Sequence, residues 1–142
     1  MEILVTFPGN KRVDAQFGAH HVSTDQPVEL GGADAAPAPF DLFLTSLATC
    51  AGIYVLGFCQ ARKIPTEGLA LRQIVESDPK THLPTHVKLE ITLPPGFPSE
   101  YRAAVVRAAE GCKVKKALAA PPAFEVVTTE GAPTLTATSA LS

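Results

Sequence analysis

The stretch that decides the fold is FDLFLTSLATCAGIYVLGFCQARK, residues 40–63, which has no proline and no charge between Asp41 and Arg62. At about 1.5 Å of rise per residue it predicts a helix about 36 Å long. A helix that is apolar on all sides is either a core element or a membrane span. We interpret it as a central helix around which a sheet and a partner chain are wrapped, with Cys50 carrying a thiol inward.

The membrane alternative is weaker. Residues 42–61 carry no charge and are long enough to span a bilayer. The run nevertheless contains two threonines, a serine and a glutamine, and the rest of the chain has the pattern of an ordinary α+β protein. We therefore predict no membrane partner and a cytoplasmic location.

Composition points to one domain in an oligomer. The 142 residues suit a single domain over residues 1–142, with a small, uncharged and loosely ordered tail over residues 131–142. Only 18% of the residues are charged, below the usual quarter, which suggests that apolar surface is hidden between chains. The net charge of −2 gives no indication of nucleic-acid binding. Three cysteines, an odd number, do not make a disulfide framework and favour a reducing compartment.

Alternation of polar and apolar residues predicts antiparallel strands on both sides of the central helix. The clearest case is THVKLEITL, residues 85–93, which has one apolar and one polar face. Prolines and paired glycines make residues 25–39 a loop. The predicted strands are residues 2–7, 11–17, 20–24, 69–77, 85–93 and 123–129, and the further helical segments are 99–111 and 114–119. The fold class is therefore α+β.

The cysteines are the candidate chemistry. Cys50 and Cys59 are nine residues apart on one helix and should point to opposite faces. Cys112 ends the apolar stripe of the second helix. That stripe is expected to pack on the central-helix face with Phe43, Leu47, Cys50 and Tyr54. A Cys50–Cys112 thiol pair is then sterically reasonable, and inert buried thiols are the alternative.

A reactive thiol needs a cation or a helix end to lower its pKa. Three lysines, at positions 113, 115 and 116, crowd Cys112, although a solvated helix end explains them equally well. Cys50 lies far from any charge in the sequence, so its activator should come from elsewhere, with Lys11 or Arg12 as candidates.

Other chemistry has little support in the sequence. There is no phosphate loop, no CxxC and no HExxH motif. His82 and His86 lack the cysteine or carboxylate spacing of a metal site. We predict no metal and no cofactor.

Two motifs resemble the OsmC/Ohr family, in particular its less characterised OsmC-like branch. The first is Pro39-Phe40-Asp41-Leu42 followed by Thr49-Cys50, with Gly31-Gly32 and Pro37 upstream. The second is AEGCKV, residues 109–114, with Lys116. The order of the predicted elements fits the family too, and the resemblance covers residues 11–127.

The resemblance implies an OsmC-like fold, an antiparallel sheet wrapped around a long central helix in an intertwined homodimer. It implies a thiol-dependent peroxidase for organic hydroperoxides, and for hydrogen peroxide, in oxidative stress defence. Cys50 matches the peroxidatic cysteine, which becomes a sulfenic acid, and Cys112 matches the resolving cysteine. A thiol reductant would restore both. Arg12 and Asp41 are the weaker catalytic candidates.

Phe40, Phe43 and Tyr54 would form the apolar pocket that admits an organic peroxide. Cys59 is expected to be a buried spectator. A second class of function stays open at this point. It is a non-catalytic homodimer that binds a small apolar ligand, or a redox sensor, in which Cys50 and Cys112 serve packing or sensing.

Overall fold

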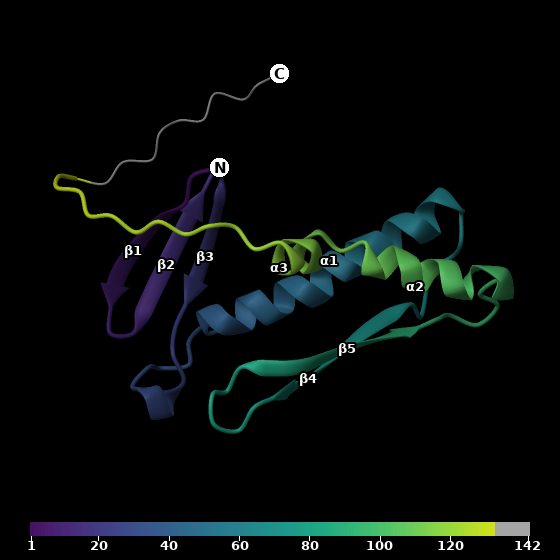
Figure 1. The fold of residues 1–142 in the computed structure, drawn as a ribbon, viewed down its shortest axis with the longest axis horizontal. Coiled ribbons are helices and arrows are strands. Elements are labelled where there is room, and N and C mark those ends of the chain that lie inside the picture. The colour runs from purple at the N-terminus through teal and green to yellow at the C-terminus, as the bar shows by residue number, and fades with distance from the viewer. Residues whose placement is uncertain (133–142) are drawn as a thin grey trace, which may run out of the picture. The chain divides into compact units, whose positions relative to one another are not determined.

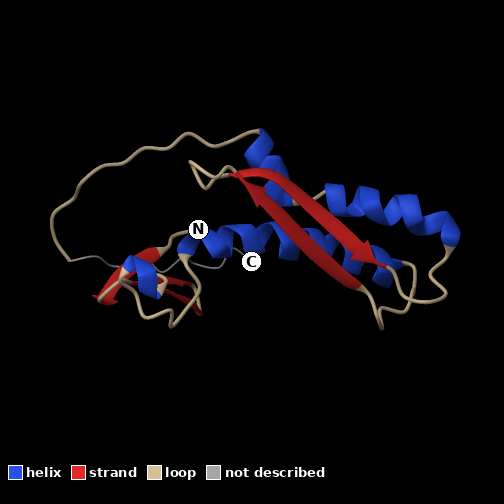
Figure 2. Ribbon diagram, turned by 90° about the horizontal axis from the view of Figure 1, so that it is seen from below, coloured by secondary structure: helices blue, strands red, loops and turns tan. Residues whose placement is uncertain are grey.

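A computed structural model describes residues 1–132 and shows an α+β chain with two small antiparallel sheets (Figures 1 and 2). The predicted tail lies mostly outside the described residues. The described chain divides into two compact units, residues 1–43 with residues 124–132, and Leu44–Ala123. The elements, in chain order, are β1 (Leu4–Gly9), β2 (Arg12–Phe17), β3 (His20–Thr24), α1 (Pro39–Ala61), β4 (Ala70–Ser77), β5 (Pro84–Thr92), α2 (Arg102–Glu110) and α3 (Lys113–Ala119).

The first unit contains the sheet β1-β2-β3, in which each strand pairs antiparallel with the next. The turn between β1 and β2 uses the positive φ angles of Gly9 (133°) and Asn10 (52°), as the Pro8-Gly9-Asn10 signal predicts. A short 3₁₀ helix, Val28–Leu30, lies in the loop that follows. Three predicted strands are therefore confirmed.

Helix α1 begins at Pro39, where a missing N–H costs nothing because the first helical N–H groups have no partner inside the helix. It ends at Ala61. Lys63 takes a left-handed conformation (φ 55°), and the N–H of Ile64 bonds to the carbonyl of Cys59 at 3.0 Å. Among residues 1–132, α1 is the one helix that is long and apolar enough to cross a membrane.

The second unit is built around a stripe of α1 spaced every four residues: Leu47, Ala51, Val55 and Cys59. Ala51, Val55 and Cys59 belong to one buried cluster with residues of α2 and the adjoining loops, including Val105 and Ala109. Leu71, Leu89 and Ile91 of the hairpin β4–β5 pack against this cluster. The expected packing face of α1 was therefore partly wrong, because Tyr54 lies at its margin, 39% exposed.

Two sequence predictions need correction. The helix expected over residues 99–111 starts as a 3₁₀ turn, Ser99–Tyr101, before α2. The strand expected over residues 123–129 is absent from the described chain, where this segment has no regular secondary structure and is exposed. Its sequence has strand propensity, but no strand among residues 1–132 supplies hydrogen bonds to it.

Candidate functional site

Cys50 and Cys112 come together in the second unit. Cys50 is half-buried on α1, and Cys112 is completely buried between α2 and α3. The Sγ of Cys112 donates to the carbonyl oxygen of Leu47 at 3.9 Å, one turn before Cys50. A Cβ on Gly111 would lie 3.5 Å from the Tyr54 ring and 3.1 Å from the Ala108 oxygen, so the turn passes close to α1. The Cys112 thiol is also a hydrogen-bonding neighbour of Cys50, so the structure brings these two predicted residues together.

Surrounding groups lower the pKa of Cys50. The largest contribution is a hydrogen bond from the backbone N–H of Val114, followed by one from the Cys112 thiol. The backbone N–H and the charge of Lys113 act in the same direction, while burial opposes them. Both N–H groups belong to the first turn of α3, where donors are left without partners inside the helix. The arrangement favours a thiolate at Cys50.

Cys59 has a different environment. Its side chain is fully buried in the core cluster, and burial raises the pKa of its thiol. It lies on the buried stripe of α1, whereas Cys50 lies about half a turn away, as their spacing predicts. The expected burial is confirmed, and the role of Cys59 as a spectator stays a prediction.

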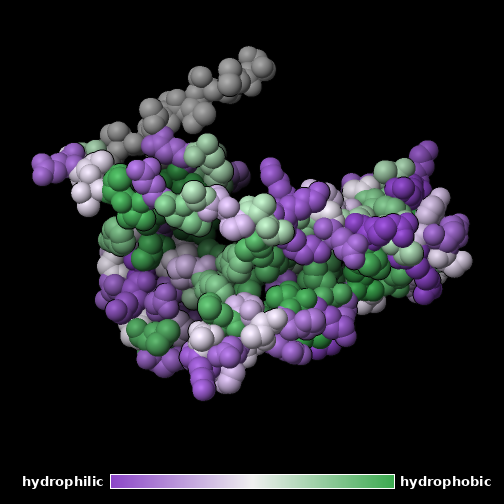
Figure 3. All heavy atoms as spheres, viewed as in Figure 1, coloured by the Kyte–Doolittle hydropathy of each residue, from purple (hydrophilic) through white to green (hydrophobic). Residues whose placement is uncertain are grey.

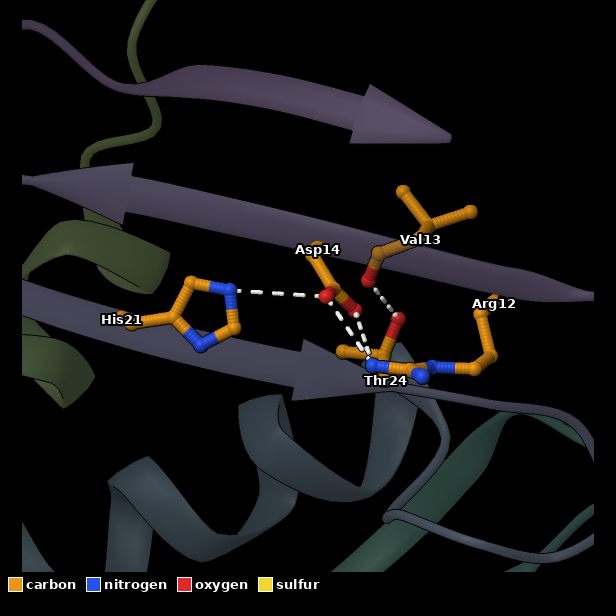
Figure 4. A network of polar contacts seen from close by, with 5 residues as sticks. All are labelled: Arg12, Val13, Asp14, His21 and Thr24. Atoms are coloured by element: carbon orange, nitrogen blue, oxygen red, sulfur yellow. Dashed lines mark hydrogen bonds and ion pairs between the residues drawn. The ribbon is translucent and has the colours of Figure 1, made fainter. Parts of the chain in front are cut away.

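Arg12 belongs to the first unit, on β2. Its Nη2 lies 3.1 Å from a carboxylate oxygen of Asp14, and Nε2 of His21 on β3 lies 3.4 Å from the same oxygen (Figure 4). Beside this group, the Thr24 hydroxyl on β3 donates to the Val13 carbonyl on β2 at 2.6 Å. Asp14 is 6% exposed, so a nearly buried carboxylate holds the exposed Arg12 guanidinium. Sequence reasoning singled out Arg12 and missed Asp14, two residues away on the same face of the strand.

Asp41, the second weaker candidate, caps α1. Its carboxylate accepts the backbone N–H of Ala38 at 3.2 Å, as an acidic residue at the third helical position does in a capping box. In the first unit, the ring centroids of Phe40 and Phe43 lie 5.4 Å apart. Tyr54 belongs to the second unit, where it lines a shallow hollow with Ile53, Gly57 and Phe58. Their role as a substrate pocket remains a prediction.

Asp25 is a buried residue that the sequence analysis did not identify. Its carboxylate is 1% exposed and accepts the backbone N–H groups of Gln26 (2.8 Å), Ala33 (3.1 Å) and Ala35 (3.1 Å). These bonds, the one from Ala35 first, lower the pKa of Asp25 despite its burial. Gly32 is required in this loop because a Cβ there would overlap the Gln26 carbonyl. The only signal in the sequence was an aspartate before a loop with paired glycines.

Within residues 1–132, no group of three or more histidine, cysteine, aspartate or glutamate side chains could hold a metal ion.

The class of protein is defined by an α+β fold with one thiol on the long helix α1 and a second thiol, next to it, at the turn between α2 and α3. The model of the OsmC-like protein family matches residues 31–127, and the chain belongs to this family. No curated protein sequence matches it.

Solved structures with low sequence identity share the fold. One, described as an osmotic stress induced and detoxification response protein, is from Psychrobacter arcticus 273-4. It has a TM-score of 0.69 and 24% identity, over 81% of this chain and 85% of that one. An OsmC-like protein from Mycoplasma pneumoniae has a TM-score of 0.66 and 13% identity, over 84% and 87%. An organic hydroperoxide resistance protein from Legionella pneumophila has a TM-score of 0.52 and 22% identity, over 82% and 87%.

Proposed function

We propose that this protein is a thiol-dependent peroxidase that reduces organic hydroperoxides, and hydrogen peroxide, in oxidative stress defence. The observation that carries the proposal is the environment of Cys50, which has a lowered pKa and the Cys112 thiol as an immediate neighbour. The name of the Legionella pneumophila relative points the same way.

The reaction has two steps in the protein. The Cys50 thiolate attacks the terminal oxygen of the hydroperoxide, the O–O bond breaks, and an alcohol leaves after it takes up a proton. Cys50 is then a sulfenic acid. The Cys112 sulfur displaces its hydroxyl, which leaves as water, and a Cys50–Cys112 disulfide forms. A dithiol reductant exchanges with this disulfide and restores both thiols while becoming oxidised itself.

The assignments outside the thiol pair rest on the resemblance to the family. Arg12 is proposed to stabilise the thiolate and the developing charge on oxygen, and Asp41 to support it. Phe40, Phe43 and Tyr54 are proposed to admit the apolar part of the peroxide.

The working form is proposed to be a cytoplasmic, intertwined homodimer. Apolar side chains that are exposed in the single chain support a second copy as partner: Phe7 is 80% exposed and Ile53 is 61% exposed. Burial of such side chains between chains would stabilise a dimer.

The test is peroxide-driven loss of thiols from the reduced protein. One equivalent of cumene hydroperoxide should remove two of the three thiols per chain, and dithiothreitol or dihydrolipoamide should support turnover. Cys50→Ser and Cys112→Ser should each abolish the paired thiol loss, and Cys50→Ser should also abolish turnover. A chain that consumes no peroxide with either reductant would instead be the non-catalytic apolar-ligand binder or redox sensor.

A further inference from the structure

Helix α2 packs on α1 through apolar side chains, and this packing ends with α2. Val105 of α2 belongs to the same buried cluster as Ala51 and Val55 of α1. Figure 3 shows a band of apolar surface between α2 and the β4–β5 hairpin. Helix α3, which follows, has no buried residue. The position of α3 relative to Cys50 therefore depends on the contacts of the turn between α2 and α3.

That turn contacts α1 at a second point besides the carbonyl of Leu47, and this point is the ring of Tyr54. A Cβ on Gly111 would lie 3.5 Å from both Cδ1 and Cε1 of the ring, which is an ordinary van der Waals distance. The ring therefore lies directly beside Gly111, the residue that precedes Cys112. Both contact residues belong to the second unit of one chain.

Tyr54 also lies on the same side of α1 as Cys50. The two residues are four positions apart, and side chains at that spacing are neighbours on a helix. A long side chain in a helix leans toward the N-terminal end, which brings the Tyr54 ring over the turn that contains Cys50. One ring thus connects the part of α1 that carries the first thiol with the turn that carries the second.

Local hydrogen bonds join this turn to α3. The N–H of Gly111 bonds to the carbonyl of Ala108 at 3.0 Å, and the N–H of Lys116 bonds to the carbonyl of Cys112 at 3.1 Å. A displacement of Gly111 would therefore move the Cys112 thiol together with the first N–H groups of α3. These are the groups that surround the Cys50 sulfur.

We propose that Tyr54 is a positioning residue for the thiol pair, which holds the turn of Cys112 against α1 and thereby favours the Cys50–Cys112 disulfide over the two free thiols. The contact atoms are ring carbons, so phenylalanine should serve equally well. This role rests on the proposed thiol chemistry. It is distinct from the substrate contact proposed above, because it acts through Cys112.

The test is the reduction potential of the Cys50–Cys112 disulfide, measured without peroxide. The protein is equilibrated with reduced and oxidised glutathione, quenched and analysed by peptide mass spectrometry. Oxidised glutathione takes two electrons and two protons from the two thiols and becomes two molecules of glutathione, while the disulfide forms. Tyr54→Ala should lower the equilibrium constant for disulfide formation about tenfold, which is a shift of about 30 mV toward a more oxidising potential.

A graded series and a matched control accompany this variant. Tyr54→Phe should keep the wild-type potential, and Tyr54→Leu should lie between Tyr54→Phe and Tyr54→Ala. Ile53→Ala, at the next residue of α1 and in the same shallow hollow, should leave the potential unchanged. If Tyr54→Ala does not fold, Tyr54→Leu decides. A wild-type potential in the folded variants, or an equal shift in Ile53→Ala, would overturn the proposal.

A second readout separates positioning from general stabilisation of the fold. The pKa of Cys50, measured by alkylation, should rise in the order Tyr54→Phe, Tyr54→Leu, Tyr54→Ala, because the same turn carries the first N–H groups of α3. A side chain that only stabilises the fold would lower the free energy of unfolding and leave both the potential and this pKa unchanged.

The outcome is also separable from that of the peroxidase proposal. A shifted potential in Tyr54→Ala would support the positioning role even if the wild type consumes no peroxide. Peroxide turnover by the wild type with an unshifted potential in Tyr54→Ala would overturn the positioning role alone. A wild type that forms no Cys50–Cys112 disulfide at any ratio of the two glutathione forms would overturn both proposals.

Discussion

The thiol of Cys112 donates to the backbone oxygen of Leu47, across 3.9 Å, from a residue 65 positions later in the chain. This contact ties the turn between α2 and α3 to the helical turn that precedes Cys50. The first N–H groups of α3 and the Cys112 thiol then lie together around the Cys50 sulfur. This contact between residues far apart in the sequence thus holds the Cys112 thiol, and the N–H groups that favour the thiolate, next to Cys50.

The first prediction concerns the acidity of Cys50. Its folded pKa is lowered, so the thiolate persists below the ordinary thiol value of 9.0, and alkylation by iodoacetamide should reach half its maximal rate below that pH. Cys59 is an internal control, since burial raises its pKa and blocks access. Peptide-level mass spectrometry of timed reactions separates the two sites. Equal pH profiles for Cys50 and Cys59 would contradict the geometry.

The second prediction assigns part of that acidity to Lys113. Lys113→Gln removes the charge, and Lys113→Pro removes both the charge and the N–H, so the pKa of Cys50 should rise in the order wild type, Gln, Pro. Proline fits this first helical position because Cys112 before it is extended (φ −47°, ψ 122°). Lys116→Gln is the control and should leave the alkylation profile unchanged. The idea fails if Lys113→Pro retains the wild-type profile while folded.

The third prediction separates Cys59 from the reaction. Cys59→Ala should leave peroxide turnover intact, because its side chain is fully buried and lies about half a turn round α1 from Cys50. It should lower the free energy of unfolding by about 1 kcal/mol through the lost packing. Turnover and denaturant titrations measure the two effects. A large loss of turnover in a folded Cys59→Ala protein would require a catalytic part for this thiol.

The fourth prediction concerns the buried carboxylate of Asp25. Its folded pKa is lowered below 3.8, so its contribution to stability is present above that value and is lost as the pH falls through the folded pKa. Asp25→Asn should therefore lower the melting temperature by several degrees near pH 7. The difference in melting temperature between this variant and the wild type should narrow below about pH 3.8.

Asp34→Asn, in the same loop, is the matched control for Asp25. Asn tolerates the left-handed backbone at that position (φ 52°), so the variant should melt close to wild type. Thermal unfolding followed by circular dichroism from pH 7 to pH 3 measures both variants. A gap between Asp25→Asn and wild type that stays constant over this range would show that ionisation of Asp25 does not contribute.

Local pattern was sufficient for most elements. Pro39 and Pro65 bounded α1, and strict alternation identified the strand that became β5, because each signal acts over a few neighbouring residues. The spacing of cysteines on apolar stripes made a Cys50–Cys112 pair sterically reasonable but left inert buried thiols as the alternative, and the family resemblance was needed to choose between them. The strand expected over residues 123–129 failed for a physical reason, since a strand needs hydrogen bonds from another strand and propensity does not supply one.

The amino-acid sequence by itself determined the order of the elements up to α3, the family resemblance and the two candidate thiols. Only the tertiary structure decided the environment of those thiols, since the N–H groups of residues 113 and 114 reach Cys50 from more than 60 positions away. It also decided that the Asp25 carboxylate is buried and accepts backbone N–H groups of its loop. The electrostatic environment of a side chain depends on groups that are distant in the sequence and close in space. No local sequence pattern encodes such groups.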